Sequence, residues 1–179
     1  WKTLRKELIR DYNDPTSSSD FGNDIIPHML NSGLPLYVHR FCGYWKDVGT
    51  IHSYWQANLE MIDPNNGLDI YDQSWRIYTS AKNLPPQYVG KEAKISECLV
   101  NEACVVEGRI TNSVLFNNVT IEEGAVVKNS VILSGSVIKK DAVVINAVIA
   151  EDQIVDEGQR IGKDDEHVYL LADGVLTEE

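Results

Sequence analysis

Apolar positions repeat every seventeen residues between Asn112 and Gly162. The repeat divides this stretch without gaps into the rows NSVLFNNVTIEEGAVVK, NSVILSGSVIKKDAVVI and NAVIAEDQIVDEGQRIG. Four columns are apolar in every row: Val114, Val131 and Val148; Leu115, Ile132 and Ile149; Ile121, Ile138 and Val155; Val127, Val144 and Ile161. A fifth column, at a turn, holds Gly124, Asp141 and Gly158. Aliphatic, largely β-branched residues that return at fixed offsets are typical of a solenoid of short strands.

The row is one residue shorter than three hexapeptides, which fits a triangular coil with three flat faces. A coil buries its apolar columns only against the coils above and below it, so roughly three coils are needed for stability. We therefore expect the repeated Val and Ile side chains, Val131 among them, to point inward. Residues 98–100 align with residues 113–115, and Val89 and Ile95 indicate an earlier partial coil. The alternative is a β-sandwich with three similar hairpins, but the close column agreement favours a parallel β-helix.

The first eighty residues show other periods. Apolar spacing predicts helices over residues 1–11, 23–31 and 51–62, the last with Thr50 as its N-cap. Residues 36–44 are rich in aromatic and β-branched side chains and predict a strand. Turn-forming residues follow as far as Pro86. We expect an α/β segment at residues 1–70, a linker at residues 71–87 and the β-helix at residues 88–179.

Charge and cysteine content exclude several classes of function. The chain of 179 residues has a net charge of −11; residues 1–80 carry 7 basic and 10 acidic side chains, and residues 81–179 carry 9 and 17. This balance argues against a nucleic-acid surface. Cys42, Cys98 and Cys104 show no CxxC spacing, so we expect neither a disulfide framework nor a zinc site, and a cytoplasmic location. No apolar run is long enough to span a membrane.

Asp47 is the strongest chemical candidate. It lies on a short loop after the predicted strand and just before the capped helix, where free N–H groups and the helix dipole favour phosphate oxygens. A carboxylate there can bind Mg²⁺ while the ion binds the phosphate. An aspartate that only closes a turn is the commoner case, and the same choice applies to Asp20. No histidine lies between Val89 and Gly162, so the coils lack the histidine base of hexapeptide acyltransferases and the three histidine zinc ligands of β-helical carbonic anhydrases.

Several motifs resemble the C-terminal part of the bacterial glucose-1-phosphate adenylyltransferase family. They are SDFGNDIIPHML, GYWKDVGTIHSYWQANLEMI, LDIYDQSWRIYT with LPPQYV, and coil sequences such as CLVNEACVVEG and NSVILSG. The resemblance implies a mainly β chain with a left-handed parallel β-helix of hexapeptide-like coils. The C-terminal part of an α/β Rossmann-like nucleotidyltransferase domain precedes it. Handedness comes from the resemblance alone.

The resemblance also implies a reaction, in which ATP and glucose 1-phosphate give ADP-glucose and pyrophosphate for glycogen biosynthesis. Asp47 matches the family aspartate that helps to bind Mg²⁺. The main substrate contacts are expected upstream of Trp1, so the chain has no certain catalytic residue and is predicted to be an inactive fragment. The β-helix is expected to serve oligomerisation and allosteric coupling, in a homotetramer or in a heterotetramer with a paralogous subunit.

Three alternatives stay open on the sequence. One is the non-catalytic regulatory subunit of the same enzyme, although the Asp47 motif favours the catalytic type. Another is a different sugar nucleotidyltransferase with a β-helix, such as a uridylyltransferase-acetyltransferase, against which the histidine-free coils argue. The third is a purely structural solenoid, which leaves Trp45 and Asp47 unexplained.

Overall fold

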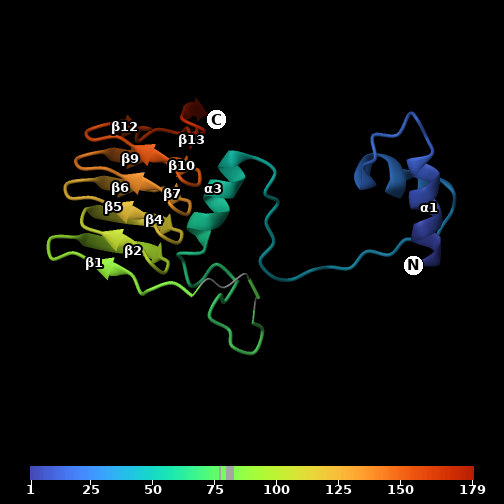
Figure 1. Cartoon of the computed structure of the whole chain (residues 1–179). Helices are drawn as coiled ribbons and strands as arrows, with labels where there is room; N and C mark the ends of the chain where they lie inside the picture. Colours follow the sequence, from blue (N-terminus) through green and yellow to red (C-terminus); the bar gives the residue numbers. More distant parts are fainter. Residues whose placement is uncertain (77, 80–82) are drawn as a thin grey trace. The chain divides into compact units, whose positions relative to one another are not determined.

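The computed structural model describes residues 1–76, 78–79 and 83–179. It contains two compact units, Trp1–Cys42 and Gly43–Glu179 (Figure 1). Part of the expected linker, residues 77 and 80–82, lies outside the described residues.

The first unit is helical. It contains α1 (Lys2–Tyr12), a π-helical turn η1 (Phe21–Ile25) and α2 (Ile26–Asn31). The helices expected at residues 1–11 and 23–31 are thus confirmed, with the second beginning as a π-helix. Glu7 is buried and accepts from Arg10 Nε at 3.2 Å, with His28 Nε2 3.3 Å away.

The prediction of a strand at residues 36–44 is wrong. This segment has no regular secondary structure, and its Tyr37 and Val38 are more than nine-tenths exposed. Its aromatic and β-branched composition favours extended backbone, but a strand also needs a neighbour to complete its hydrogen bonds. Within the described part of the chain, no segment pairs with residues 36–44.

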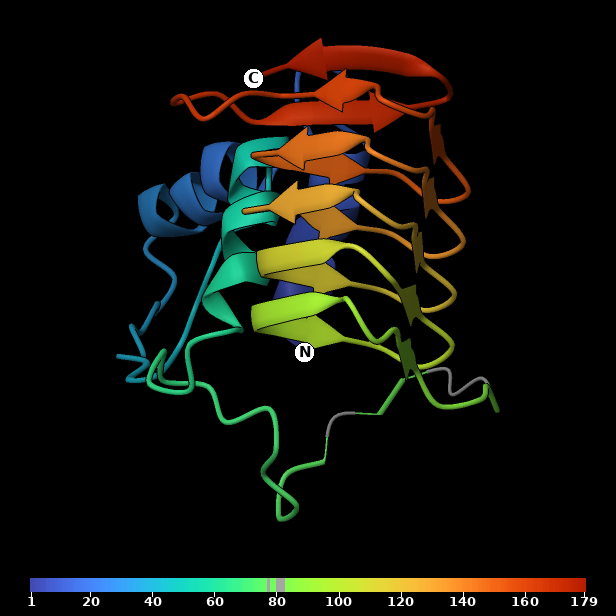
Figure 2. The same cartoon turned by 90° about the vertical axis from the view of Figure 1, so that its left-hand side faces the viewer.

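The second unit holds α3 (Ile51–Glu60) and a parallel β-solenoid (Figure 2). The strands are β1 (Tyr88–Val89), β2 (Lys94–Val100), β3 (Val105–Val106), β4 (Arg109–Leu115), β5 (Thr120–Ile121), β6 (Val126–Lys128), β7 (Val131–Ile132), β8 (Val137–Ile138), β9 (Val143–Ile145), β10 (Ala147–Ile149), β11 (Ile154–Val155), β12 (Arg160–Ile161), β13 (Tyr169–Ala172) and β14 (Val175–Glu178).

The strands stack into three faces whose register follows the seventeen-residue row. Val131 pairs with Val148, Ile121 with Ile138 and Val127 with Val144. The earlier coil is two residues shorter, because Cys98 pairs with Ser113. The long strand β4 turns a corner, so its first half pairs with β6 and its second half with β7. The repeat and the alignment of residues 98–100 are therefore confirmed.

Three of the four apolar columns point inward. Leu115, Ile121 and Val127, with their equivalents in the next rows, form one buried core. The Val131 column is buried too, but it belongs to a second cluster outside the coils. There, Val131, Val148 and Val168 pack against α3. The inward placement of Val131 was wrong, because strand residues alternate in direction and Ile132 takes the inward position.

The first residue of each row forms a corner between two faces. Asn112, Asn129 and Asn146 have φ of 43°, 48° and 48°, a left-handed backbone that asparagine tolerates better than most side chains. Asn112 Nδ2 donates to Asn129 Oδ1 at 2.9 Å, and Asn129 Nδ2 donates to Asn146 Oδ1 at 3.1 Å. The repeated asparagine thus tolerates the turn and satisfies its own amide along the stack.

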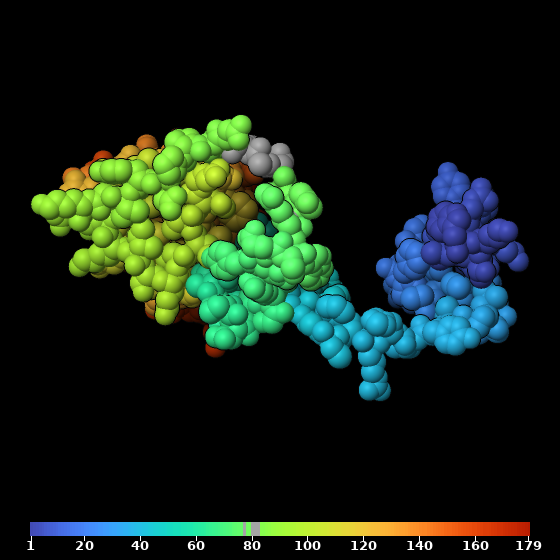
Figure 3. Space-filling model, turned by 90° about the horizontal axis from the view of Figure 1, so that it is seen from below, coloured from blue at the N-terminus to red at the C-terminus, as the bar shows by residue number. Residues whose placement is uncertain are grey.

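The two ends of the solenoid differ. At the C-terminal end, β13 extends the sheet and β14 pairs with it antiparallel through a turn at Asp173 and Gly174. At the other end, seen from below in Figure 3, the segment after α3 lies against the first coil. A hollow of about 550 Å³ there is lined by Ile70 and Tyr71 together with Leu99 of β2.

The compact units divide at residue 42, not at the expected domain boundary of residue 70. The physical reason is that the apolar side of α3 packs against the solenoid and is partly buried there. The domain ranges stay a prediction, with residues 1–70 expected to be the C-terminal part of a catalytic domain, residues 71–87 a linker and residues 88–179 the β-helix domain.

Candidate functional site

The Asp47 loop lies next to a helix that is fixed on the solenoid. Ile51, Tyr54, Trp55 and Leu59 of α3 pack against the cluster around Val131. Trp55 Nε1 also donates to the backbone oxygen of Asn129 at 2.6 Å. The apolar spacing that predicted this helix thus places these four side chains on the face that contacts the solenoid, and the Trp55 hydrogen bond adds a directional contact with the asparagine corner.

Thr50 is the N-cap of α3, as expected. Its side chain accepts from Ser53 N at 3.1 Å, and Ser53 Oγ in turn accepts from Thr50 N at 3.0 Å. This reciprocal capping box satisfies two backbone donors and fixes where the loop ends.

The backbone N–H groups in the first turn of α3 are less available to a phosphate than the sequence implies. Ser53 N is taken by the cap, and His52 N donates to Glu179 Oε2 at 2.9 Å. The expectation of free N–H groups is therefore wrong for these two residues. No local pattern indicates that a carboxylate 127 positions away reaches this helix.

Asp47 is exposed on its loop. Within the part of the chain that the structure describes, it has no ion pair and no side-chain hydrogen bond, so it does not act as a turn-closing residue. Two hollows of about 520 Å³ each lie beside the loop, one lined by Val48 and Thr50 and the other by Trp45 and Met61. The carboxylate lines neither of them.

The loop is tied to the far end of α3. Tyr44 Oη donates to Glu60 Oε2 at 2.8 Å, and Lys46 Nζ donates to Glu60 Oε1 at 2.8 Å. Burial, followed by the hydrogen bond to Glu60, raises the pKa of Tyr44 to about 12. The hydrogen bonds from Lys46 and Tyr44 lower the pKa of Glu60. The local sequence does not mark Glu60 as part of this site, because a glutamate in the last turn of a helix normally faces solvent.

The other candidates have structural roles. Asp20 accepts from Asn23 N at 2.7 Å and caps η1. Burial raises the pKa of Cys98 and of Cys104, so both thiols are held in the protonated form that core residues adopt. Among the described residues, no three His, Cys, Asp or Glu side chains lie close enough together to hold a metal ion.

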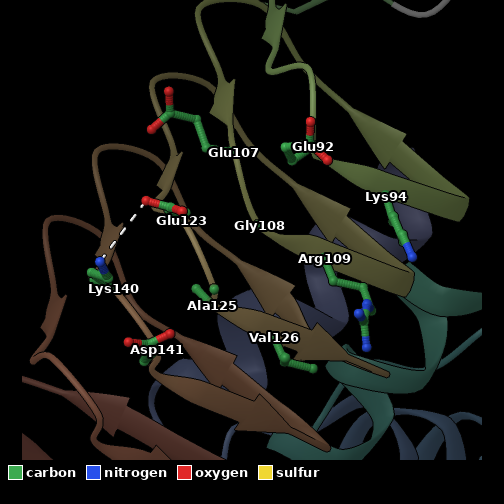
Figure 4. A pocket seen from close by; sticks show the side chains of 11 residues that line it. Glu92, Lys94, Glu107, Gly108, Arg109, Glu123, Ala125, Val126, Lys140 and Asp141 are labelled. Atoms are coloured by element: carbon green, nitrogen blue, oxygen red, sulfur yellow. Dashed lines mark ion pairs between the residues drawn. The ribbon is translucent and has the colours of Figure 1, made fainter.

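A further hollow of about 400 Å³ lies along one edge of the coils (Figure 4). Its lining carries both signs of charge, the positive side chains being those of Lys94, Arg109 and Lys140 and the negative ones including Glu107 and Glu123. Lys140 Nζ is 3.9 Å from Glu123 Oε2. Mixed exposed charges of this kind are typical of a solvated surface, and the hollow lacks a histidine that could serve as a base.

In the described residues, no helix has the length and apolar character that crossing a membrane requires.

Comparison with known proteins identifies both parts of the chain. Residues 80–170 match the family model described as GlmU-like, C-terminal hexapeptide, and residues 2–63 match the model described as nucleotidyl transferase. The second match includes the Asp47 loop and α3. It therefore covers residues that pack on the solenoid.

Relatives named glucose-1-phosphate adenylyltransferase align with most of the chain. The protein of Geobacillus stearothermophilus is 52% identical over 72% of this chain and 33% of its own length. The protein of Clostridium perfringens is 49% identical over 72% of this chain and 33% of its own length. For Bacillus cereus the values are 46%, 71% and 34%.

The chain thus spans about one third of the length of the relatives that it matches. The chain belongs to the GlmU-like C-terminal hexapeptide family, and with its nucleotidyl transferase segment it corresponds to a C-terminal portion of the glucose-1-phosphate adenylyltransferases.

Proposed function

We propose that this chain works as the C-terminal part of an enzyme that converts ATP and glucose 1-phosphate to ADP-glucose and pyrophosphate. The observation that carries the proposal is the Asp47 loop, which lies within the nucleotidyl transferase match and leaves its carboxylate exposed at the entry to a fixed helix. In the proposed reaction, a phosphate oxygen of glucose 1-phosphate bonds to the α-phosphorus of ATP. The bond from that phosphorus to the bridging oxygen breaks, and pyrophosphate leaves.

Asp47 fits one place in a magnesium site. Mg²⁺ in nucleotide enzymes is commonly held by one or two carboxylates, substrate phosphates and water, so a single free carboxylate is the donor that such a site needs from this segment. When bound, the ion neutralises phosphate charge and aligns the groups for in-line transfer. The chain's own residues hold the Asp47 carboxylate on a short loop between Lys46 and the Thr50 cap.

The solenoid is proposed to serve assembly and allosteric coupling. The complete enzyme would be a homotetramer, or a heterotetramer with a paralogous subunit. Its proposed compartment is the cytoplasm, in keeping with the free thiols of Cys42, Cys98 and Cys104. Two alternatives differ from this proposal. The regulatory subunit of the same enzyme would have this architecture but no turnover. A uridylyltransferase-acetyltransferase would need a histidine base that these coils lack.

The 179-residue chain alone is expected to form no ADP-glucose. Its one candidate metal ligand cannot replace the nucleotide and sugar contacts that the proposal places elsewhere. The measurement is pyrophosphate release with ATP, glucose 1-phosphate and Mg²⁺, with a boiled sample as control. Release well above that control would show that the chain carries a complete active site.

A further inference from the structure

One carboxylate joins the Asp47 loop to the last turn of α3. Glu60 uses its two oxygens separately, accepting from Tyr44 Oη with one and from Lys46 Nζ with the other, each at 2.8 Å. These donors stand on either side of Trp45, and they lie 16 and 14 residues from Glu60 in sequence. The contacts therefore fix the start of the loop from a distant point of the chain.

The partners are shielded enough for the contacts to last. The side chains of Lys46 and Glu60 are 24% and 31% exposed. The pKa of Glu60 is lowered by its two donors, which is the response of a carboxylate held in its charged form. A charge-assisted hydrogen bond is shorter and stronger than a neutral one, so the geometry is well defined.

The other end of the loop is fixed independently. Thr50 forms the capping box of α3, and α3 is held on the solenoid by the Trp55 contact and by apolar packing. Only Asp47, Val48 and Gly49 lie between the Lys46 contact and the Thr50 cap. Three residues between two fixed points have little freedom, which limits the positions that the Asp47 carboxylate can take.

We propose that Glu60 is a positioning residue for the nucleotidyl transfer, holding the Asp47 loop in register with the substrate phosphates through Tyr44 and Lys46. The inference rests on the proposed function for the role of Asp47. In this role Glu60 does not contact the substrate. It acts through Tyr44 and Lys46, which it holds at the start of the Asp47 loop. α3 then has a second role besides packing, because it connects the Asp47 loop to the solenoid in a defined position.

The first test uses the 179-residue chain and measures the loop directly. In Glu60→Gln, the backbone ¹⁵N order parameters of residues 44–49 are expected to fall into the flexible range, below about 0.6, while those of the coils stay unchanged. Asp156→Asn is the matched control, because it removes the comparable contact at 2.8 Å from Lys139 on the solenoid. Unchanged order parameters over residues 44–49 in Glu60→Gln would overturn the proposal.

The second test uses the longer enzyme that contains this chain. Glu60→Gln is expected to lower kcat about 10- to 100-fold and to raise the Mg²⁺ concentration needed for half-maximal rate, with the KM for glucose 1-phosphate unchanged. Tyr44→Phe removes one of the two contacts with little change in packing and is expected to give a smaller loss. Adding Glu60→Gln to a Tyr44→Phe, Lys46→Met background is expected to cause no further loss, because the same contacts are already gone.

The outcomes separate this inference from the proposed function. If Asp47→Asn lowers turnover and Glu60→Gln does not, the proposed function stands and the positioning role is wrong. A full further loss in the Tyr44→Phe, Lys46→Met background would also contradict it, since Glu60 would then act by another route. If neither Asp47 nor Glu60 affects turnover, the proposed function fails as well.

Discussion

Replacing Ile132 with aspartate is expected to unfold the solenoid. Ile132 is fully buried in the middle coil, where its strand pairs with Leu115 on one side and Ile149 on the other. An aspartate there would lose water without gaining a partner, at a cost of several kcal/mol against a domain stability of roughly 5–15 kcal/mol. Loss of the circular dichroism of the sheet and of the thermal transition is the expected result.

The neighbouring Val131→Asp is the matched control. Val131 is equally buried, but it faces α3 from outside the coils. The charge is therefore expected to release α3 while the coils survive, with the emission of Trp55 moving to the red as its ring meets water. If both variants unfold the sheet alike, or if Val131→Asp leaves Trp55 unchanged, the assignment of the two columns is wrong.

Asp47→Asn in the longer enzyme is expected to lower kcat by about 100-fold or more without changing the melting temperature. Losing a metal ligand in phosphoryl transfer costs several kcal/mol of transition-state stabilisation, and each 1.4 kcal/mol or so is tenfold in rate. Stability should not change, because Asp47 is exposed and has no side-chain partner in the described chain.

Asp69→Asn serves as the control for that variant. Asp69 accepts from Tyr71 N in a turn, so its substitution tests whether any loop aspartate matters. Normal turnover in Asp47→Asn, or an equal loss of kcat in Asp69→Asn, would show that Asp47 is an ordinary surface residue.

The repeat made the solenoid predictable from sequence. Within residues 112–162, a seventeen-residue period sets both the length of the coil and the register of the parallel pairs, as the pairing of Ile121 with Ile138 shows. The period does not say which of two adjacent valine and isoleucine positions faces inward when both are buried. Val131 was misplaced for that reason, since its burial depends on α3, which lies 71 to 80 residues earlier in the chain.

Long-range partners account for the other differences. Residues 36–44 have the composition of a strand, but strand formation depends on a neighbour that composition cannot reveal. The carboxylates of Glu60 and Glu179 meet donors 14 or more residues away, and no local pattern marks such contacts. The N-cap at Thr50, by contrast, is a local signal and was predictable.

The place of Asp47 in the metal site can be measured most directly by anomalous diffraction. Crystals of the longer enzyme with ATP and Mn²⁺ in place of Mg²⁺ would locate the ion by its own scattering. A peak is expected at bonding distance from an Asp47 oxygen and next to the nucleotide phosphates. A fully occupied ion at the phosphates with Asp47 turned to solvent would contradict it.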